Sequence, residues 1–442
     1  MDKQKIVANV SSLTADQLFE EIKQGNITLD ELKNTGNLDP SKRKRITDLQ
    51  ATLDLKDDEA WERAHYGNEV ALSNYITNYP TGKHVHEAKE RIEYLEQARR
   101  DSQAAKQGIL ENIKRNPNSY SPDQIIGYLQ NGTITKGELI SCNIPDSVVQ
   151  SLDEINPPSL KLGDTPNSIP NGYTEVYFWG IPGSGKTCAL AAILSTAEKL
   201  GFLDIATGPG YNYMTLLKNI FTDDNAVLPP PSPVETTQYL PFTLKMEDEK
   251  YPRSVSLIEL SGEIFQCFYN LNAKKPFMSQ SHQDTFDTLI QFLKGNNRKI
   301  HFFFIDYNKE NKKDVNSITQ GDYLSAASTY FKNNEVFGKT TDAVYVVLTK
   351  SDLMPCSKEE RVAKAKEYLQ SNNFLAFINT LKDRCKQYSI NAGKLTVEPF
   401  SLGNVYFQQI CNFDDSAAAK IVEILIDRIA PNKKSILDVF NK

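Results

Sequence analysis

Short apolar runs alternate with amphipathic segments over the last two-thirds of the chain. Runs with the length and composition of strands lie at 175–179, 254–259, 302–305, 344–348 and 394–400. Helical segments lie at 188–199, 358–387 and 416–429. Strands that alternate with helices predict an α/β domain with a mostly parallel sheet. A further strand-like run at 238–246, a polar turn away from 254–263, predicts one antiparallel hairpin strand.

The first 155 residues instead show helical periodicity, and part of it is repeated. Thr14–Leu32 and Ser121–Leu139 share Asp, Gln, Gly, Ile, Thr, Glu and Leu in register at an offset of 107 positions. Each copy begins at a capping hydroxyl, forms a short helix, stops at Gly25 or Gly132, and begins a second helix. Between the copies, segments in 57–95 predict a helix pair similar to a tetratricopeptide unit, with a Tyr-Pro boundary at Pro80.

These patterns predict an all-α region followed by the α/β domain. The expected segments are a helical module at 1–52, a tetratricopeptide-like hairpin at 53–105, a second helical module at 106–155, a Pro- and Gly-rich linker at 156–172, and the α/β domain at 173–442. A lone helical hairpin cannot bury its own apolar face, so it must pack on its flanking modules or on a partner. Residues 1–155 are interpreted as an adaptor that binds protein partners, and a solvated helical spacer is the alternative.

Composition narrows the class of protein. The net charge of −6 over 442 residues provides no general basic field for nucleic acid, so no nucleic-acid partner is expected. The longest apolar runs are strand-sized, which predicts no membrane span and no signal peptide. Six scattered cysteines without a C-x-x-C pair indicate reduced thiols and a cytoplasmic location.

Residues 180–187, Gly-Ile-Pro-Gly-Ser-Gly-Lys-Thr, match the phosphate-binding pattern G-x-x-x-x-G-K-[ST]. A strand-like run precedes the loop and a helix follows it, as this pattern requires. Glycines at 180, 183 and 185 let backbone N–H groups turn inward around a polyphosphate. Lys186 is expected to reach the β- and γ-phosphates, and Thr187 to offer its hydroxyl to Mg²⁺.

Three weaker motifs follow the phosphate loop in order. Glu259-Leu-Ser-Gly262 resembles the D-x-x-G element of GTPases, with Glu in place of Asp. Thr349-Lys-Ser-Asp352 ends an apolar strand and resembles the guanine-reading [NT]-K-x-D motif. Ser401-Leu-Gly403 is similar to the S-A-K-type loop, without its lysine. With these motifs, residues 172 to about 430 resemble a Ras-like, translation-factor-class P-loop GTPase of the bacterial multidomain type.

The resemblance implies GTP or GDP and Mg²⁺ as cofactors. Metal contacts are expected from Thr187, Glu259 and a switch-loop threonine, Thr236 or Thr237. Expected catalytic residues are Lys186, Thr237 and Glu263, which occupies the place of the water-orienting glutamine. The expected nucleotide contacts are Gly180, Gly183, Ser184, Gly185, Lys186, Thr187, Cys188, Gly262, Thr349, Lys350, Asp352, Ser401 and Leu402.

Asp352 would select guanine, because adenine cannot present a ring N–H and an amine together to one carboxylate. Glu263 would face the γ-phosphate as an anion, so slow basal turnover, well under about one per second, is expected until a partner or second subunit completes the site. The sequence thus predicts a slowly hydrolysing GTP switch or assembly protein, with a nucleotide-dependent homodimer left open. Two alternatives remain: an ATPase that uses Asp306, at the end of the run 299–306, as its Walker B acid, and a nucleotide-binding scaffold that does not hydrolyse.

Overall fold

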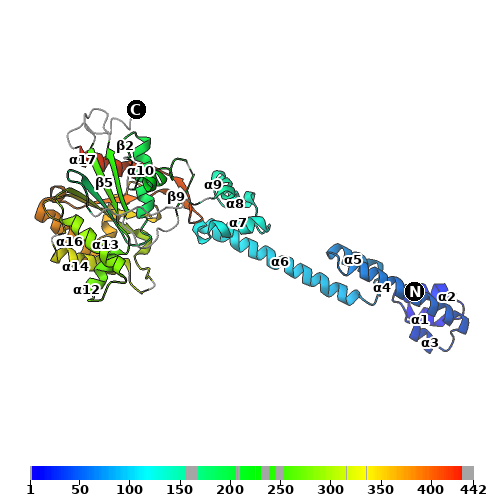
Figure 1. Ribbon diagram of the computed structural model, residues 1–442. Helices are drawn as coiled ribbons and strands as arrows, with labels where there is room; N and C mark the ends of the chain where they lie inside the picture. Colours follow the sequence, from blue (N-terminus) through cyan, green and yellow to red (C-terminus); the bar gives the residue numbers. More distant parts are fainter. Residues whose placement is uncertain are drawn as a thin grey trace. The chain divides into compact units, whose positions relative to one another are not determined.

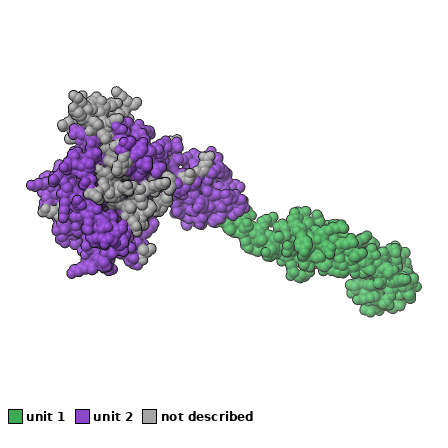
Figure 2. All heavy atoms as spheres, viewed as in Figure 1, with its two compact units in different colours: residues 1–111 green, residues 112–442 purple. Residues whose placement is uncertain are grey.

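The computed structural model describes residues 2–155, 157, 168–205, 207, 210–223, 225–229, 238–244, 253–314, 316–334 and 336–430, with only the backbone at 154 and 238–244. The chain forms two compact units, Met1–Glu111 and Asn112–Lys442 (Figure 2). They are described separately below. The long helix α6 (Val85–Arg115) belongs to both, because the division falls within its last turns.

Unit 1 is entirely helical over its described residues. Besides α6, its helices are α1 (Lys3–Ala8), α2 (Ala15–Lys23), α3 (Leu29–Asn34), α4 (Pro40–Ala64) and α5 (Glu69–Asn78) (Figure 1). One apolar cluster joins α1 to α4 around Leu18 and Leu32, and a second gathers around Trp61, Leu72 and Tyr75. Each cluster draws on several helices, so no single hairpin has to bury its apolar face alone.

The two repeat copies fold in the same way, which confirms the predicted helix pairs. In the first copy, Thr14 and Thr28 cap α2 and α3 through reciprocal capping boxes. In the second, Ser121 and Thr135 do the same for α7 (Pro122–Gln130) and α8 (Lys136–Ser141). Gly25 and Gly132 both have positive φ, 77° and 74°, which explains why glycine stands between the helices of each pair.

Unit 2 contains a seven-stranded sheet in the order β2-β4-β5-β1-β6-β7-β8. Its strands are β1 (Thr174–Trp179), β2 (Leu203–Asp204), β4 (Gln238–Leu244), β5 (Arg253–Glu259), β6 (Arg298–Asp306), β7 (Thr341–Thr349) and β8 (Thr396–Phe400). Five neighbouring strands, β5-β1-β6-β7-β8, are parallel. Strand β4 runs antiparallel to β5, with Gln238 opposite Glu259, which confirms the predicted hairpin. This is an α/β arrangement consistent with a P-loop GTPase fold.

Alternate residues of β1 face two different helical layers. Tyr177 and Trp179 belong to the apolar cluster of α12, α13, α14 and α16, whereas Val176 and Phe178 belong to that of α10, α11 and α17. Figure 1 labels α10, α12, α13, α14, α16 and α17 around the sheet. The helices of the two layers are α10 (Lys186–Lys199), α11 (Tyr211–Lys218), α12 (Ile264–Asn272), α13 (Gln280–Lys294), α14 (Gln320–Asn333), α15 (Arg361–Tyr368), α16 (Asn372–Tyr388) and α17 (Ser416–Ile429).

A small antiparallel sheet was not predicted. It has the order β3-β10-β9, formed by β3 (Asn225–Val227), β9 (Gly403–Tyr406) and β10 (Ile410–Phe413). Phe407 and Gln408 form the β9–β10 turn with positive φ, where Asn or Gly is usual, so the turn has no sequence signature. Asn118 holds this turn, since its Oδ1 accepts the Gln408 N–H at 2.6 Å and its amide donates to Val405 O at 2.8 Å. Helix α9 (Asp146–Ser151) lies against β3 and β10.

Candidate functional site

The predicted phosphate loop connects the central strand β1 to helix α10. Gly183 and Gly185 have φ of 68° and 83°, so both adopt the left-handed conformation that glycine permits. A Cβ on Gly180 would lie 2.5 Å from Ser184 Oγ and 3.0 Å from Phe304 O, which leaves no room for a side chain. Helix α10 begins at Lys186, so its N-terminal N–H groups point to the space enclosed by the loop.

Lys186, Thr187 and Glu259 meet where β5 ends beside β1. Lys186 is buried, and burial lowers the pKa of its ammonium while the nearby Glu259 opposes that shift. Thr187 Oγ1 donates a hydrogen bond to Glu259 Oε1. The other carboxylate oxygen, Oε2, accepts from the Tyr213 hydroxyl at 2.8 Å. Tyr213 lies on α11 and belongs to no sequence motif; only its position in this fold identifies it.

The predicted metal ligands that the structure describes fit Mg²⁺. A threonine hydroxyl and a carboxylate oxygen are hard oxygen donors of the kind this ion prefers. The hydrogen bond from Thr187 shows that the longer side chain of Glu259 still reaches the threonine. Thr236 and Thr237, the predicted switch-loop threonines, lie outside the described residues, so neither is placed here.

Gly262 and Glu263 follow β5 and line the other side of the loop. A Cβ on Gly262 would collide with the backbone N of Pro182, so Gly262 packs directly on the phosphate loop. Glu263 is buried, and its Oε2 lies 2.6 Å from His282 Nε2. Ser279 Oγ lies 2.7 Å from the other ring nitrogen, Nδ1. The sequence did not single out His282, which reaches Glu263 from α13.

The Thr349-Lys-Ser-Asp352 motif adjoins the phosphate loop from the end of β7. Thr349 Oγ1 donates to Ser184 O at 2.8 Å, and it lies 3.2 Å from Ile305 O. Lys350 adopts a left-handed conformation (φ 56°) and begins the turn that carries Asp352. The Asp352 side chain is half-buried, and no described residue donates a hydrogen bond to its carboxylate. This carboxylate therefore keeps its acceptor capacity for a ligand.

Ser401 and Leu402 follow β8 at the same edge of the sheet. Ser401 Oγ accepts the Gly403 N–H at 3.1 Å, and Leu402 O accepts the Asp414 N–H at 2.9 Å.

Burial raises the pKa of the Cys188 thiol to about 11, with a smaller contribution from Glu259 and an opposing one from Lys350 and Lys186. Cys188 thus lies within electrostatic range of both the metal-side and the base-side groups.

A Walker B acid would have to lie beside the Thr187 hydroxyl, and Asp306 lies elsewhere. It ends β6, which flanks β1 on the side opposite β5. Its carboxylate is fully buried, and it accepts from Lys350 Nζ at 2.7 Å and from the Asn308 N–H at 2.8 Å. Both oxygens are engaged away from Thr187, whose hydroxyl bonds to Glu259. The geometry therefore favours Glu259 over Asp306 as the acid beside Thr187.

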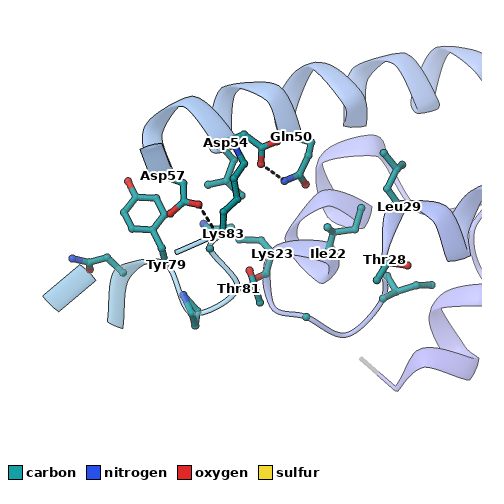
Figure 3. A pocket seen from close by; sticks show the side chains of 16 residues that line it. Ile22, Lys23, Thr28, Leu29, Gln50, Asp54, Asp57, Tyr79, Thr81 and Lys83 are labelled. Atoms are coloured by element: carbon teal, nitrogen blue, oxygen red, sulfur yellow. Dashed lines mark hydrogen bonds between the residues drawn. The ribbon is translucent and has the colours of Figure 1, made fainter. Parts of the chain in front are cut away.

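Unit 1 has a hollow of its own, with a volume of about 360 Å³. The α2–α3 turn, the middle of α4 and the loop after α5 line it. Figure 3 shows Tyr79 near Asp57, with Ile22 and Leu29 toward the α2–α3 turn. The buried Asp57 braces the wall, because it accepts from the Tyr75 hydroxyl at 2.5 Å and from the Lys83 N–H at 2.7 Å. The lining is thus both apolar and acidic.

Within the described ranges, no helix is long and apolar enough to cross a bilayer. All six cysteines are free thiols. No protein-family model matches the chain, and a search of the curated proteins finds no match.

Two solved structures show a distant likeness to the chain. One is Roco2 RocCORdC of Methanosarcina barkeri bound to GDP, at 14% identity and a TM-score of 0.26, with 60% of this chain and 52% of that one covered. The other is nucleolar GTP-binding protein 1 of Plasmodium falciparum, at 14% identity and a TM-score of 0.26, with 62% and 96% covered. The chain thus spans about half the length of the first. Likenesses at this level establish neither a family nor a ligand, and nothing in these comparisons supports the tetratricopeptide resemblance of residues 53–105.

Proposed function

We propose that the α/β domain binds GTP and GDP with Mg²⁺ and hydrolyses GTP slowly, as a cytoplasmic switch or assembly protein. The observation that carries this proposal is the hydrogen bond from Thr349 Oγ1 to Ser184 O. It ties the motif that would select guanine to the loop that would hold the phosphates. Strands β1 and β7 are separated by β6, yet parallel strands bring their carboxyl ends to one edge, where nucleotides bind in such sheets.

The reaction proposed is attack of water on the γ-phosphorus with cleavage of the bond to the β–γ bridging oxygen. It converts GTP and water into GDP, inorganic phosphate and a proton. The protein contributes positioning and charge stabilisation. Lys186 and the N–H groups at the start of α10 would bind the phosphates, and Thr187 and Glu259 would hold Mg²⁺, which neutralises charge on the β- and γ-phosphate oxygens when bound.

Glu263 gives a physical reason to expect slow turnover. As an anion next to the γ-phosphate it would repel the group it has to approach. The contact with His282 Nε2 draws this carboxylate toward α13. We infer that Glu263 orients the water only after this pair opens.

Nucleotide titrations test the proposal directly. Fluorescent GDP and ADP analogues are titrated with Mg²⁺ into the full chain, and phosphate release is followed with GTP and with ATP. Tighter binding of GDP than of ADP, with slow phosphate release from GTP, supports the proposal. Preference for ADP would favour the ATPase alternative, and tight GTP binding without phosphate release would favour the non-hydrolysing scaffold.

We propose further that residues 1–155 bind a protein partner. The hollow of unit 1 supports this, as do exposed apolar side chains on the same unit at Leu55 (61%), Tyr66 (87%), Val70 (64%) and Tyr94 (68%). A partner recovered with the full chain should be lost with Tyr66→Ser/Val70→Ser, because the change removes apolar contact area. The variant should remain folded, because both side chains are exposed and belong to no apolar core. Retention of every partner by this variant would argue against binding through that surface.

Sedimentation with GDP and with a non-hydrolysable GTP analogue tests a nucleotide-dependent homodimer.

A further inference from the structure

A second lysine lies against the phosphate loop, and no sequence motif marks it. Lys309 is the last residue of the 3₁₀ turn η3 (Tyr307–Lys309), which follows β6. Its Nζ donates to Pro182 O at 2.7 Å. A Cβ on Gly183 would lie 2.7 Å from the same ammonium, so glycine at this position makes room for it. The cation is therefore built into the outer wall of the loop.

The position of Pro182 shows which part of a nucleotide this ammonium would meet. Gly262 packs on the backbone N of Pro182, while Lys309 bonds to its carbonyl. In the proposed function, Gly262 approaches the γ-phosphate, so Pro182 and Lys309 lie at the γ-phosphate end of the loop. Lys186 enters from the helix that follows the loop. The two ammonium groups thus come from different elements.

The charges around Lys309 leave it available to an anion. Burial lowers the pKa of its ammonium; Asp306 opposes this shift, and Lys350 and Lys312 add to it. The nearby carboxylate of Asp306 is already bonded to Lys350, and no described carboxylate forms an ion pair with Lys309. An ammonium has three donors, of which Pro182 takes one, so two remain.

From this geometry we propose that Lys309 is a second phosphate-binding cation of the site, supplied in cis, which contacts oxygens of the γ-phosphate and the β–γ bridge. This proposal rests on the proposed function and names a residue for it. The bond to Pro182 O holds the ammonium in place before the nucleotide arrives. A cation there offsets negative charge as the bond to the bridging oxygen breaks, the role that a finger arginine has in other phosphoryl-transfer sites.

The test compares Lys309→Ala, Lys309→Gln and Lys309→Arg with the wild type, and Lys312→Ala is the matched control. Lys312 is an exposed lysine three residues further along the chain. For each protein, affinities for GDP and for a non-hydrolysable GTP analogue are measured with Mg²⁺, and phosphate release is measured in a single turnover. The ratio of the two affinities separates contact with the γ-phosphate from bracing of the loop.

Lys309→Ala and Lys309→Gln should weaken the triphosphate analogue at least about tenfold, change GDP affinity less than about threefold, and slow phosphate release about tenfold or more. Lys309→Arg should restore most of each value, and Lys312→Ala should match the wild type. An equal loss of GDP and analogue affinity, or wild-type behaviour of Lys309→Ala, overturns the assignment while the proposed function stands. A wild type that binds no nucleoside triphosphate overturns both.

Discussion

In the proposed function, the selection of guanine over other bases depends on the carboxylate of Asp352. Asp352→Asn should replace one acceptor with an amide that donates, which suits the C2 carbonyl of xanthine better than the C2 amine of guanine. We expect GDP affinity to fall at least about tenfold and XDP affinity to rise above it, because a mismatched polar pair costs about 1–3 kcal/mol. Competition of XDP and GDP against a fluorescent nucleotide measures the exchange.

Asp352→Ala serves as the control for this exchange, because it removes the acceptor and supplies no donor. It should weaken GDP without a gain for XDP. If Asp352→Asn binds GDP as tightly as the wild type, Asp352 does not read the base, and the guanine preference has no residue to carry it.

Tyr213 offers a test of the metal-side acid. Its hydroxyl donates to Glu259 Oε2, and burial together with Glu259 raises the pKa of that hydroxyl well above its usual value, so it remains a donor. Tyr213→Phe should leave Glu259 less well oriented and weaken Mg²⁺ affinity about tenfold. This is the lower end of the usual loss when a metal ligand loses its hydrogen-bond partner. The Mg²⁺ dependence of nucleotide retention reports this. Tyr211→Phe, an exposed tyrosine on the same helix, should change nothing.

The sequence predicts the loop residues well because their spacing is local. Gly180, Gly183 and Gly185 are fixed by steric needs within eight residues, and the structure shows the crowding and the positive φ that require them. Tyr213, His282 and Lys309 could not be predicted, because each reaches the site from an element remote in sequence. Their roles depend on side-chain geometry that no spacing rule encodes.

At the level of single elements, β6 carries a buried titratable group away from the proposed site. His301 is fully buried, and its Nδ1 accepts from Trp179 Nε1 at 3.0 Å. Burial, with a smaller contribution from Lys299, lowers the pKa of this imidazole well below 6.5. Below about pH 6.5, His301 is therefore protonated in the unfolded chain but stays neutral in the folded chain. The free energy of unfolding decreases as the solution becomes more acidic.

We expect the urea midpoint of unit 2 to decrease as the pH is lowered from about 7 to about 5. His301 contributes at most about 1.4 kcal/mol per pH unit to the loss of unfolding free energy. His301→Gln cannot titrate and should flatten this dependence, even if its stability at pH 7 is lower. His86→Gln provides the control, since His86 is 86% exposed and in unit 1. An unchanged pH dependence in His301→Gln would assign the proton uptake to other groups.

Whole elements followed from the sequence where periodicity was strong. The predicted helix at 416–429 is α17, and the long helical stretch at 358–387 is two helices, α15 and α16, separated at Ser371. The sheet β3-β10-β9 was missed because its strands have three or four residues and its turn uses Phe407 and Gln408. Asn118 stabilises that turn from a part of the chain nearly 300 residues earlier, a long-range contact that local propensity cannot reveal.

For the molecule as a whole, the chain's two tryptophans give each unit its own reporter. Trp61 lies in the apolar cluster of α4, α5 and α6 in unit 1, and Trp179 lies in the core of the seven-stranded sheet. A ligand stabilises only the part of a protein that must be folded to bind it. Mg²⁺ and GDP should therefore raise the melting temperature reported by Trp179 and leave that reported by Trp61 unchanged.

Single-tryptophan variants make the measurement clean. Trp61→Phe leaves Trp179 as the reporter, and Trp179→Phe leaves Trp61. At a GDP concentration about 100 times its dissociation constant, binding adds about 2.7 kcal/mol to the unit that holds the site. For a unit of this size that is a rise of several degrees in the Trp179 transition. An equal rise in the Trp61 transition would contradict this prediction and show that unit 1 responds to the nucleotide state.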